Sequence, residues 1–171
     1  MLSAQHARAT MNAYDYSFTS IDGKPMPLSQ FKGKPILIVN TASKCGLTPQ
    51  YAGLETLEKT YGPKGLVLIG VPSNDFGGQE PGIEAEIKTF CDTKYGVTFS
   101  MTRKEKVVGG AAHPFYQWAA ETLGKDNVPK WNFHKYLIAP DGALAAAFGS
   151  RTEPAANEIK SAIETSLPKA S

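Results

Sequence analysis

Two almost uninterrupted apolar runs occupy residues 36–42 and 66–71 in the first half of the chain. Runs of this length and composition are typical of strands buried on both faces of a sheet. Between them, apolar residues recur at helical spacing over 47–61, and Pro49 suits the first turn of such a helix. This part of the chain therefore predicts a strand–helix–strand unit.

The remaining elements are predicted by shorter patterns. A helix is expected over 83–91, where Ile83, Ile87 and Cys91 share one apolar face, and another is expected to begin at His113. The chain also predicts a hairpin of 14–19 with 24–28, a short strand near 97–99, a hairpin of 135–139 with 143–148, and a closing amphipathic helix at 159–167.

This order of elements predicts an α/β protein with a central mixed sheet, helices on both of its faces and an N-terminal hairpin, an arrangement that suggests a thioredoxin-like fold. We expect a single domain over residues 14–171, because no linker, repeat or low-complexity tract interrupts the chain. Residues 1–13 form a polar leader, and the sequence leaves open whether it is ordered.

Composition excludes several classes of protein. Hydrophobic residues make up 42% and charged residues 20% of the 171 residues, which is typical of a globular chain. The net charge of +2 is too small to indicate a nucleic-acid partner, and no apolar run approaches the roughly 18 residues that span a bilayer. The leader lacks the apolar segment of a secretory signal, so we expect a cytoplasmic protein. Two cysteines do not make a disulfide scaffold, and no zinc-ligand spacing or phosphate loop occurs, so we expect no metal or cofactor.

Cys45 is the most informative residue. It follows the first buried strand and shortly precedes a helix, so it is expected in a turn at the carboxyl edge of the sheet, where reactive groups of α/β proteins collect. The free N–H groups of a helix N-terminus favour a thiolate, and Lys44 could supply a cation. A nucleophilic thiol needs such help at neutral pH. The alternative is a small buried residue without chemistry.

Gln79, Trp131 and Asn132 are further candidate site residues. Gln79 lies in a polar loop after the second buried strand, and Trp131 and Asn132 precede the strand at 135–139. Their side-chain N–H groups can hold a thiolate, or the oxygen that leaves a peroxide, without reacting themselves. Taken singly, each has an ordinary alternative, since a loop glutamine is usually solvated and a tryptophan beside a strand is usually in the core.

Cys91 has two interpretations. Its helical phase with Ile87 and Phe90 favours a packed, inert thiol. A lone second cysteine is also what a disulfide-forming pair with Cys45 requires, and sequence separation says nothing about their distance in space.

Three segments together resemble the glutathione peroxidases, in the branch that uses cysteine rather than selenium. They are residues 40–48 (NTASKCGLT), 72–81 (PSNDFGGQEP) and 130–136 (KWNFHKY). The resemblance implies a thioredoxin-like fold and a peroxidase in which Cys45 is the nucleophile, with Gln79, Trp131 and Asn132 completing a catalytic tetrad. Asp75 departs from the family pattern, and we expect its carboxylate near the pocket, opposing thiolate formation.

The resemblance also implies a reaction cycle. Cys45 would reduce hydrogen peroxide or organic and lipid hydroperoxides and become a sulfenic acid. Residues 90–99 are similar to the branch in which a resolving cysteine, here Cys91, forms an intramolecular disulfide that thioredoxin reduces. The segment 120–130 is short, as in monomeric members with an open site. We therefore expect a monomer that uses thioredoxin, or else glutathione, as its reducing thiol.

Other thiol chemistries compete with this interpretation. A peroxiredoxin loop would need Pro and Thr or Ser where Ile38 and Ala42 stand, and a thioredoxin-type dithiol would need a cysteine in place of Thr48. A hydrolase or acyl transferase would pair Cys45 with a histidine base, either His113 or His134. A thiol-based redox sensor would share the first step with a peroxidase and differ only in its kinetics.

Overall fold

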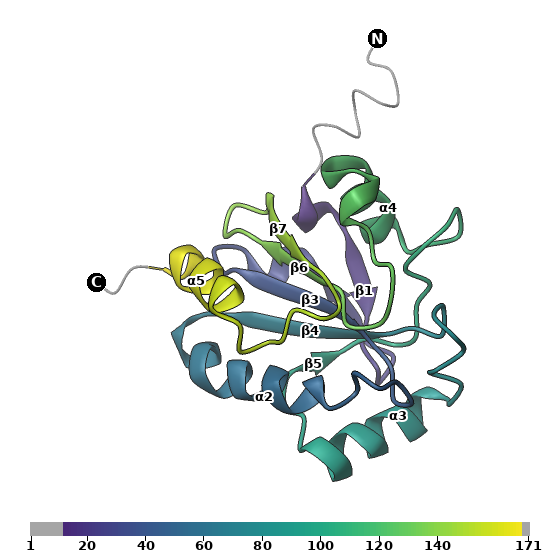
Figure 1. Cartoon of the computed structure of the whole chain (residues 1–171). Coiled ribbons are helices and arrows are strands. Elements are labelled where there is room, and N and C mark those ends of the chain that lie inside the picture. The colour runs from purple at the N-terminus through teal and green to yellow at the C-terminus, as the bar shows by residue number, and fades with distance from the viewer. Residues whose placement is uncertain (1–11, 169–171) are drawn as a thin grey trace.

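The computed structural model describes residues 12–168, and at its centre lies a five-stranded sheet in the order β5–β4–β3–β6–β7 (Figure 1). β3 pairs in parallel with β4 and antiparallel with β6, so the sheet is mixed, as predicted. β4 and β5 are parallel, and β6 and β7 are antiparallel. The strands are β3 (Ile36–Thr41), β4 (Val67–Pro72), β5 (Ser100–Met101), β6 (Lys135–Ile138) and β7 (Leu144–Phe148).

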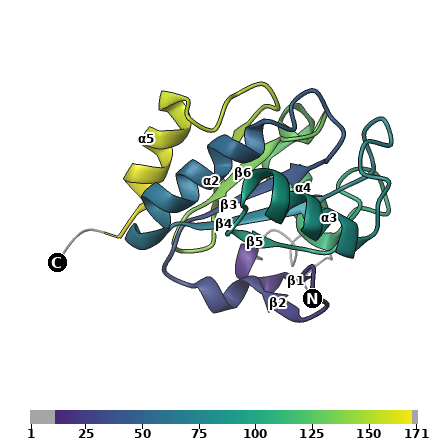
Figure 2. The ribbon, with the colours of Figure 1, turned by 90° about the horizontal axis from the view of Figure 1, so that it is seen from below.

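Helices cover both faces of this sheet, which confirms the predicted fold class. Figure 1 shows α2, α3 and α5 on one side and α4 on the other, and Figure 2 shows the β1–β2 hairpin on the opposite side of the strands from α2 and α5. The helices are α2 (Gln50–Tyr61), α3 (Glu84–Phe90), α4 (Pro114–Leu123) and α5 (Asn157–Ser166), and the hairpin consists of β1 (Ser17–Thr19) and β2 (Pro25–Pro27).

The central strand β3 is apolar on both faces because each face meets its own core. Leu37 and Val39 pack into the core shared with α2, α3 and α5, whereas Ile36 and Ile38 face the core shared with the hairpin and α4. All six residues of β3 are buried. Alternation of side chains along a strand therefore explains the uninterrupted apolar run in the sequence.

At the N-terminus, the described structure begins at Asn12, two residues before the predicted start of the domain. A strand was expected over 14–19, but Ala13–Asp15 is a turn of 3-10 helix and only Ser17–Thr19 pairs as β1. Asn12 caps that turn, since its side-chain oxygen accepts the Tyr14 N–H at 2.9 Å. Asn12 and Ala13 thus belong to the folded part, whereas the rest of the proposed leader, residues 1–11, lies outside the described residues.

The predicted helix over 83–91 starts and ends differently in the structure. Ile83 was expected on the buried face, but it precedes α3 in an extended conformation and is 62% exposed. At Cys91 the chain changes to a π-helix over Cys91–Tyr95, which ends at Gly96 in the left-handed region. π-Helical turns are rare and frequently occur at functional sites. The nearby strand lies at Ser100–Met101 rather than at 97–99.

No helix within residues 12–168 combines the length and the apolar character needed to cross a membrane.

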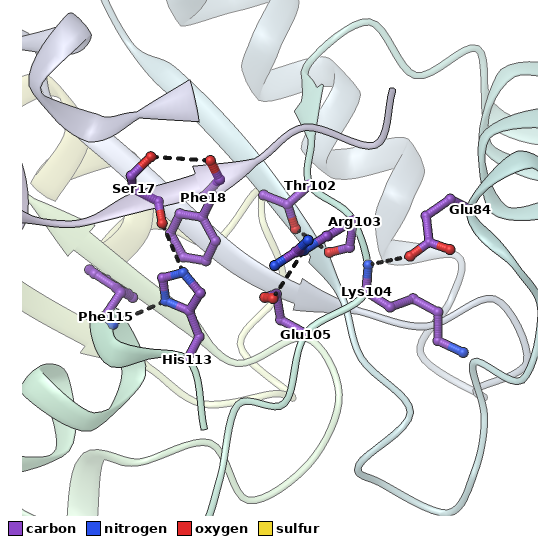
Figure 3. Close-up of polar contacts among 9 residues, drawn as sticks. All are labelled: Ser17, Phe18, Glu84, Thr102, Arg103, Lys104, Glu105, His113 and Phe115. Atoms are coloured by element: carbon purple, nitrogen blue, oxygen red, sulfur yellow. Dashed lines mark hydrogen bonds and ion pairs between the residues drawn. The ribbon is translucent and has the colours of Figure 1, made fainter. Parts of the chain in front are cut away.

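His113 joins α4 to the N-terminal hairpin. Its Nδ1 accepts the Phe115 N–H at 3.0 Å, which caps α4, and its Nε2 donates to the Ser17 carbonyl at 2.9 Å (Figure 3). The ring also stacks on Phe18, with centroids 4.0 Å apart. This arrangement needs the neutral imidazole, because a protonated Nδ1 could not accept a hydrogen bond. Burial correspondingly lowers the pKa of His113.

His134 is held in the neutral form more strongly. It is 5% exposed, and burial lowers its pKa to about 4. A backbone hydrogen bond with Asn127 opposes this shift, and the charges of Lys135 and Lys130 add to it.

The two histidines make the stability of the fold depend on pH. Both bind protons more readily in the unfolded chain, so the free energy of unfolding should fall as the pH falls below 6.5. Between pH 7 and 5.5, the free energy of unfolding of the wild type, measured by urea titration, should fall by about 1 kcal/mol more than that of His134→Gln. Equal losses in the two proteins would contradict the assignment of a neutral buried His134.

Candidate active site

Cys45 lies in the turn that connects β3 to α2. Thr48 holds this turn, since its hydroxyl oxygen accepts the Cys45 N–H at 2.9 Å and its O–H donates to the Ala42 carbonyl at 2.8 Å. The Leu47 N–H donates to Cys45 Sγ at 3.3 Å. Cys45 therefore sits where the sequence predicted, but the backbone donor to its sulfur comes from the turn, and α2 itself begins only at Gln50.

Gln79 and Asn132 are joined by a side-chain hydrogen bond. Asn132 Nδ2 donates to Gln79 Oε1 at 2.9 Å, which leaves the Gln79 NH₂ group free to act as a donor. The backbone carbonyl of Gln79 accepts the backbone N–H of Lys44 at 3.1 Å. Gln79 thus connects the loop before β6 to the residue that precedes Cys45.

Trp131 lies beside the loop that carries Gln79. Its ring centroid is 5.8 Å from that of Phe76, and its side chain is partly exposed. Gly77 has a φ of +66°, and a Cβ added there would lie 3.1 Å from the Trp131 ring and 3.4 Å from the Gln79 side chain. Glycine at this position is what allows the loop, Trp131 and Gln79 to approach one another.

The pairing of β3 with β6 brings these loops to one edge of the sheet. Because the two strands are antiparallel, the end of β3 meets the start of β6, with Val39 opposite Lys135. The pairing continues past the strand, since the Phe133 N–H donates to the Asn40 carbonyl at 2.6 Å. The Asn40 side chain also donates to the Trp131 carbonyl at 3.1 Å. The sequence pattern predicts Asn40 only as a strand residue. That it also holds the turn before β6 could be inferred only from the sheet register.

Asp75 and Lys44, which the sequence analysis related to the Cys45 thiol, each interact with other groups in the structure. The Asp75 carboxylate accepts the Val107 N–H at 2.7 Å and the Val108 N–H at 3.3 Å, so it is bonded to the chain that follows β5. The charge of Lys44 acts on the carboxylate of Glu80, where it partly opposes the rise in pKa that burial causes.

Glu80 is a buried carboxylate that the sequence analysis did not single out. It is 1% exposed, and burial raises its pKa, while hydrogen bonding with Ser43 opposes the shift. Its charge also raises the pKa of Cys91. Glu80 therefore interacts with the segment before Cys45 and with the second cysteine. A glutamate directly after Gln79 in a polar loop gave no signal that it would be buried.

Cys91 is a packed, reduced thiol in this structure. It is 1% exposed and lies in the same hydrophobic core as Cys45, and both thiols are free. Burial raises the pKa of Cys91 to about 11, whereas the Tyr51 hydroxyl opposes the shift by hydrogen bonding to the thiolate. In this conformation Cys91 is therefore protonated near neutral pH and is a weak nucleophile.

A cavity of about 430 Å³ lies between the Cys45 turn and α3. Ser43 and Lys44 line it on one side, Ile87 and Phe90 on the other, and Glu80 also contributes to its wall. Within residues 12–168, no cluster of three His, Cys, Asp or Glu side chains could hold a metal ion.

Comparison with known proteins identifies the family of the chain. The glutathione peroxidase family model matches residues 13–120, which include both cysteines and Gln79, whereas Trp131 and Asn132 follow the matched range. The hydroperoxy fatty acid reductase Gpx2 of Synechocystis is 48% identical over 88% of this chain and 96% of its own. The glutathione peroxidase-like peroxiredoxin gpx1 of Schizosaccharomyces pombe is 43% identical over 88% of this chain and 98% of its own.

Solved structures give the same result for the fold. The crystal structure of Trgpx in apo form superposes with a TM-score of 0.71 at 36% identity, covering 93% of this chain and 99% of that one. A thiol:disulfide interchange protein of the thioredoxin family from Chlorobium tepidum superposes with a TM-score of 0.66 at 16% identity, covering 90% and 93%, which supports the thioredoxin-like fold alone. By the family model and by these relatives, the chain belongs to the glutathione peroxidase family.

Proposed function

We propose that this protein is a thiol peroxidase in which the Cys45 thiolate attacks a peroxide oxygen. An S–O bond forms as the O–O bond breaks, and Cys45 becomes a sulfenic acid. The departing oxygen takes a proton and leaves as water from hydrogen peroxide, or as an alcohol from an organic hydroperoxide. The observation that carries the proposal is the position of Cys45, in a turn whose backbone donates to its sulfur and is bonded to Gln79.

Gln79, Trp131 and Asn132 act as hydrogen-bond donors in this proposal. The Gln79–Asn132 bond orients both amides, so that the Gln79 NH₂ group stays available to the thiolate or to the leaving oxygen. Trp131 adds an indole N–H, which donates but neither accepts a proton nor reacts. Donors fixed before the reaction begins stabilise developing negative charge without reorganising during it.

Cys91 resolves the sulfenic acid in this proposal. Its sulfur attacks the Cys45 sulfur, the S–S bond forms as the S–O bond breaks, and the released hydroxide takes the Cys91 proton and leaves as water. Cys91 must leave its packing to do so, and its place at the first residue of a π-helix supports a local unwinding there.

Two anchors limit the segment that unwinds. Glu55 of α2 accepts the Thr98 N–H at 2.8 Å and also its hydroxyl, which holds the chain after the π-helix. The Glu84 carboxylate accepts the Lys104 N–H at 3.0 Å, which holds the start of α3 (Figure 3). We therefore infer that the rearrangement is confined to the residues between Glu84 and Thr98, next to the cavity beside Cys45.

The family and the relatives support a proposal for the substrates. The Synechocystis relative is named a hydroperoxy fatty acid reductase and the Schizosaccharomyces pombe relative a glutathione peroxidase-like peroxiredoxin, and we propose hydrogen peroxide and organic or lipid hydroperoxides as substrates of this chain. We propose thioredoxin as the reductant of a Cys45–Cys91 disulfide, glutathione as the alternative donor, no further cofactor, and a cytoplasmic monomer as the working form.

A histidine-assisted hydrolase is disfavoured. Both ring nitrogens of His113 are engaged by backbone groups of α4 and β1, and burial lowers the pKa of His134 to about 4. Within the described residues, no hydrogen bond joins either histidine to Cys45.

A peroxide sensor is the second candidate, and the burial of Cys91 favours it. If resolution by this weakly nucleophilic thiol is slow, the Cys45 sulfenic acid persists and can react with a cysteine of another protein. The two functions differ in the rate of disulfide formation rather than in the residues they use.

Asn132→Ala should slow the oxidation of Cys45 about 100-fold, because it removes one donor and also the hydrogen bond that orients the Gln79 side chain. The rate constant is measured by stopped-flow mixing of the reduced protein with hydrogen peroxide. Asn157→Ala, which removes an exposed asparagine at the start of α5, is the matched control and should react like the wild type. Equal rates for Asn132→Ala and the control would contradict the role of Asn132.

Cys91→Ser should keep the first oxidation and lose turnover with thioredoxin, because the sulfenic acid then has no internal partner. Mass spectrometry of the peroxide-treated wild type should find a peptide that joins Cys45 to Cys91, and Cys45→Ser should abolish both steps. Full thioredoxin-dependent turnover by Cys91→Ser would remove the resolving role, and slow turnover by the wild type would favour the sensor.

A further inference from the structure

Lys135, the first residue of β6, is a fully buried charged residue next to the proposed active site. Its Nζ donates to the carbonyls of Phe133 at 2.6 Å, Gly149 at 3.4 Å and Ser150 at 3.4 Å. An ammonium group has three donors, and here each has a backbone acceptor. Burial lowers the pKa of Lys135 to about 8, with the charge of Glu153 opposing, so the amine still carries its proton at neutral pH.

These carbonyls belong to two separate segments. Phe133 directly follows Trp131 and Asn132, whereas Gly149 and Ser150 follow β7. The two segments also form walls of one cavity of about 380 Å³, to which the Trp131 side chain contributes. Lys135 is thus the link between the turn that carries the proposed donors and the segment after β7.

The segment after β7 is itself held by α2. Gln50 is the first residue of α2, and its Nε2 donates to the Ser150 carbonyl at 2.7 Å. Because α2 follows the Cys45 turn, a continuous set of contacts runs from that turn through Gln50, Ser150 and Lys135 to Phe133.

The turn needs such support because its backbone is strained. Phe133 has a φ of +67°, and it is the one non-glycine residue with positive φ in the described part of the chain. Bulky side chains rarely adopt this conformation, which persists only where surrounding contacts impose it. Lys135 bonds the carbonyl of this same residue.

We propose that Lys135 is a positioning residue, which holds the Phe133 carbonyl so that Trp131 and Asn132 stay aimed at the reacting peroxide. The inference rests on the proposed function, because Lys135 acts only through those two donors. Lys135 lies outside the four proposed catalytic residues, and its new role is to fix the positions of the donors Trp131 and Asn132.

The test compares Lys135→Met with Leu137→Ala, which truncates another buried residue of β6 whose side chain has no hydrogen-bond donor for these carbonyls. Both variants are made with Trp118→Phe, which leaves Trp131 as the only tryptophan of the chain. Lys135→Met should slow Cys45 oxidation at least 10-fold, shift the Trp131 emission to longer wavelength and increase its quenching by acrylamide. The subsequent formation of the disulfide should stay within about twofold of the parent.

The inference would be overturned if Leu137→Ala slowed Cys45 oxidation as much as Lys135→Met and the two variants had similar melting temperatures. Lys135 would then have only a general structural role. Unchanged oxidation and emission in Lys135→Met would also overturn it. If Lys135→Met fails to fold, Gln50→Ala takes its place, because it releases the Ser150 carbonyl from the other side. It should change both readouts in the same direction, and no change would contradict the proposal.

Asn132→Ala, measured in parallel, separates this inference from the proposed function. If Asn132→Ala leaves Cys45 oxidation unchanged, the donor roles fail, whatever Lys135→Met does to the Trp131 emission. If Asn132→Ala slows the reaction and Lys135→Met alters neither the rate nor the emission, the inference fails and the proposed function stands.

Discussion

The backbone pairing of Asn40 with the turn before β6 is the constraint on which the site depends. The Phe133 N–H donates to the Asn40 carbonyl, and the Asn40 N–H donates to the His134 carbonyl at 3.3 Å. These bonds fix Trp131 and Asn132 beside the strand that leads into the Cys45 turn. A slip of one residue in the β3–β6 pairing would shift this turn along β3 and move Asn132 away from its hydrogen-bond partner Gln79. The sheet register therefore determines whether the proposed donors meet.

The two cysteines share one core but differ in their environment. Cys45 lies in a turn that gives its sulfur a backbone donor, whereas Cys91 is enclosed, with burial raising its pKa to about 11. Hydrogen-bond donors to a sulfur favour the thiolate that attacks a peroxide, whereas an enclosed, protonated thiol is a weak nucleophile. In the proposed cycle Cys45 is therefore oxidised first, and Cys91 reacts only after a conformational change. Glu80, with its buried carboxylate, is electrostatically linked to the second of them.

Much of this organisation could be predicted from the sequence because it follows from local pattern. The apolar runs of β3 and β4, and the position of Cys45 between a strand and a helix, need only side-chain alternation and helical period. What depends on distant contacts could not be predicted. The exposure of Ile83 and the use of Asp75 as an acceptor for Val107 each require the folded arrangement. The burial of Lys135 is of the same kind, since a lysine at the start of a strand is ordinarily taken as exposed.

In the proposed cycle, one peroxide oxidises both cysteines of one chain. The most direct measurement mixes the fully reduced protein with one equivalent of hydrogen peroxide, without any reductant, and counts the remaining free thiols under denaturing conditions. Two thiols should disappear for each peroxide consumed, at every protein concentration, and the chain should remain monomeric on a non-reducing gel. Peroxide that is not consumed while both thiols stay free in a folded, reduced protein would contradict the proposed cycle.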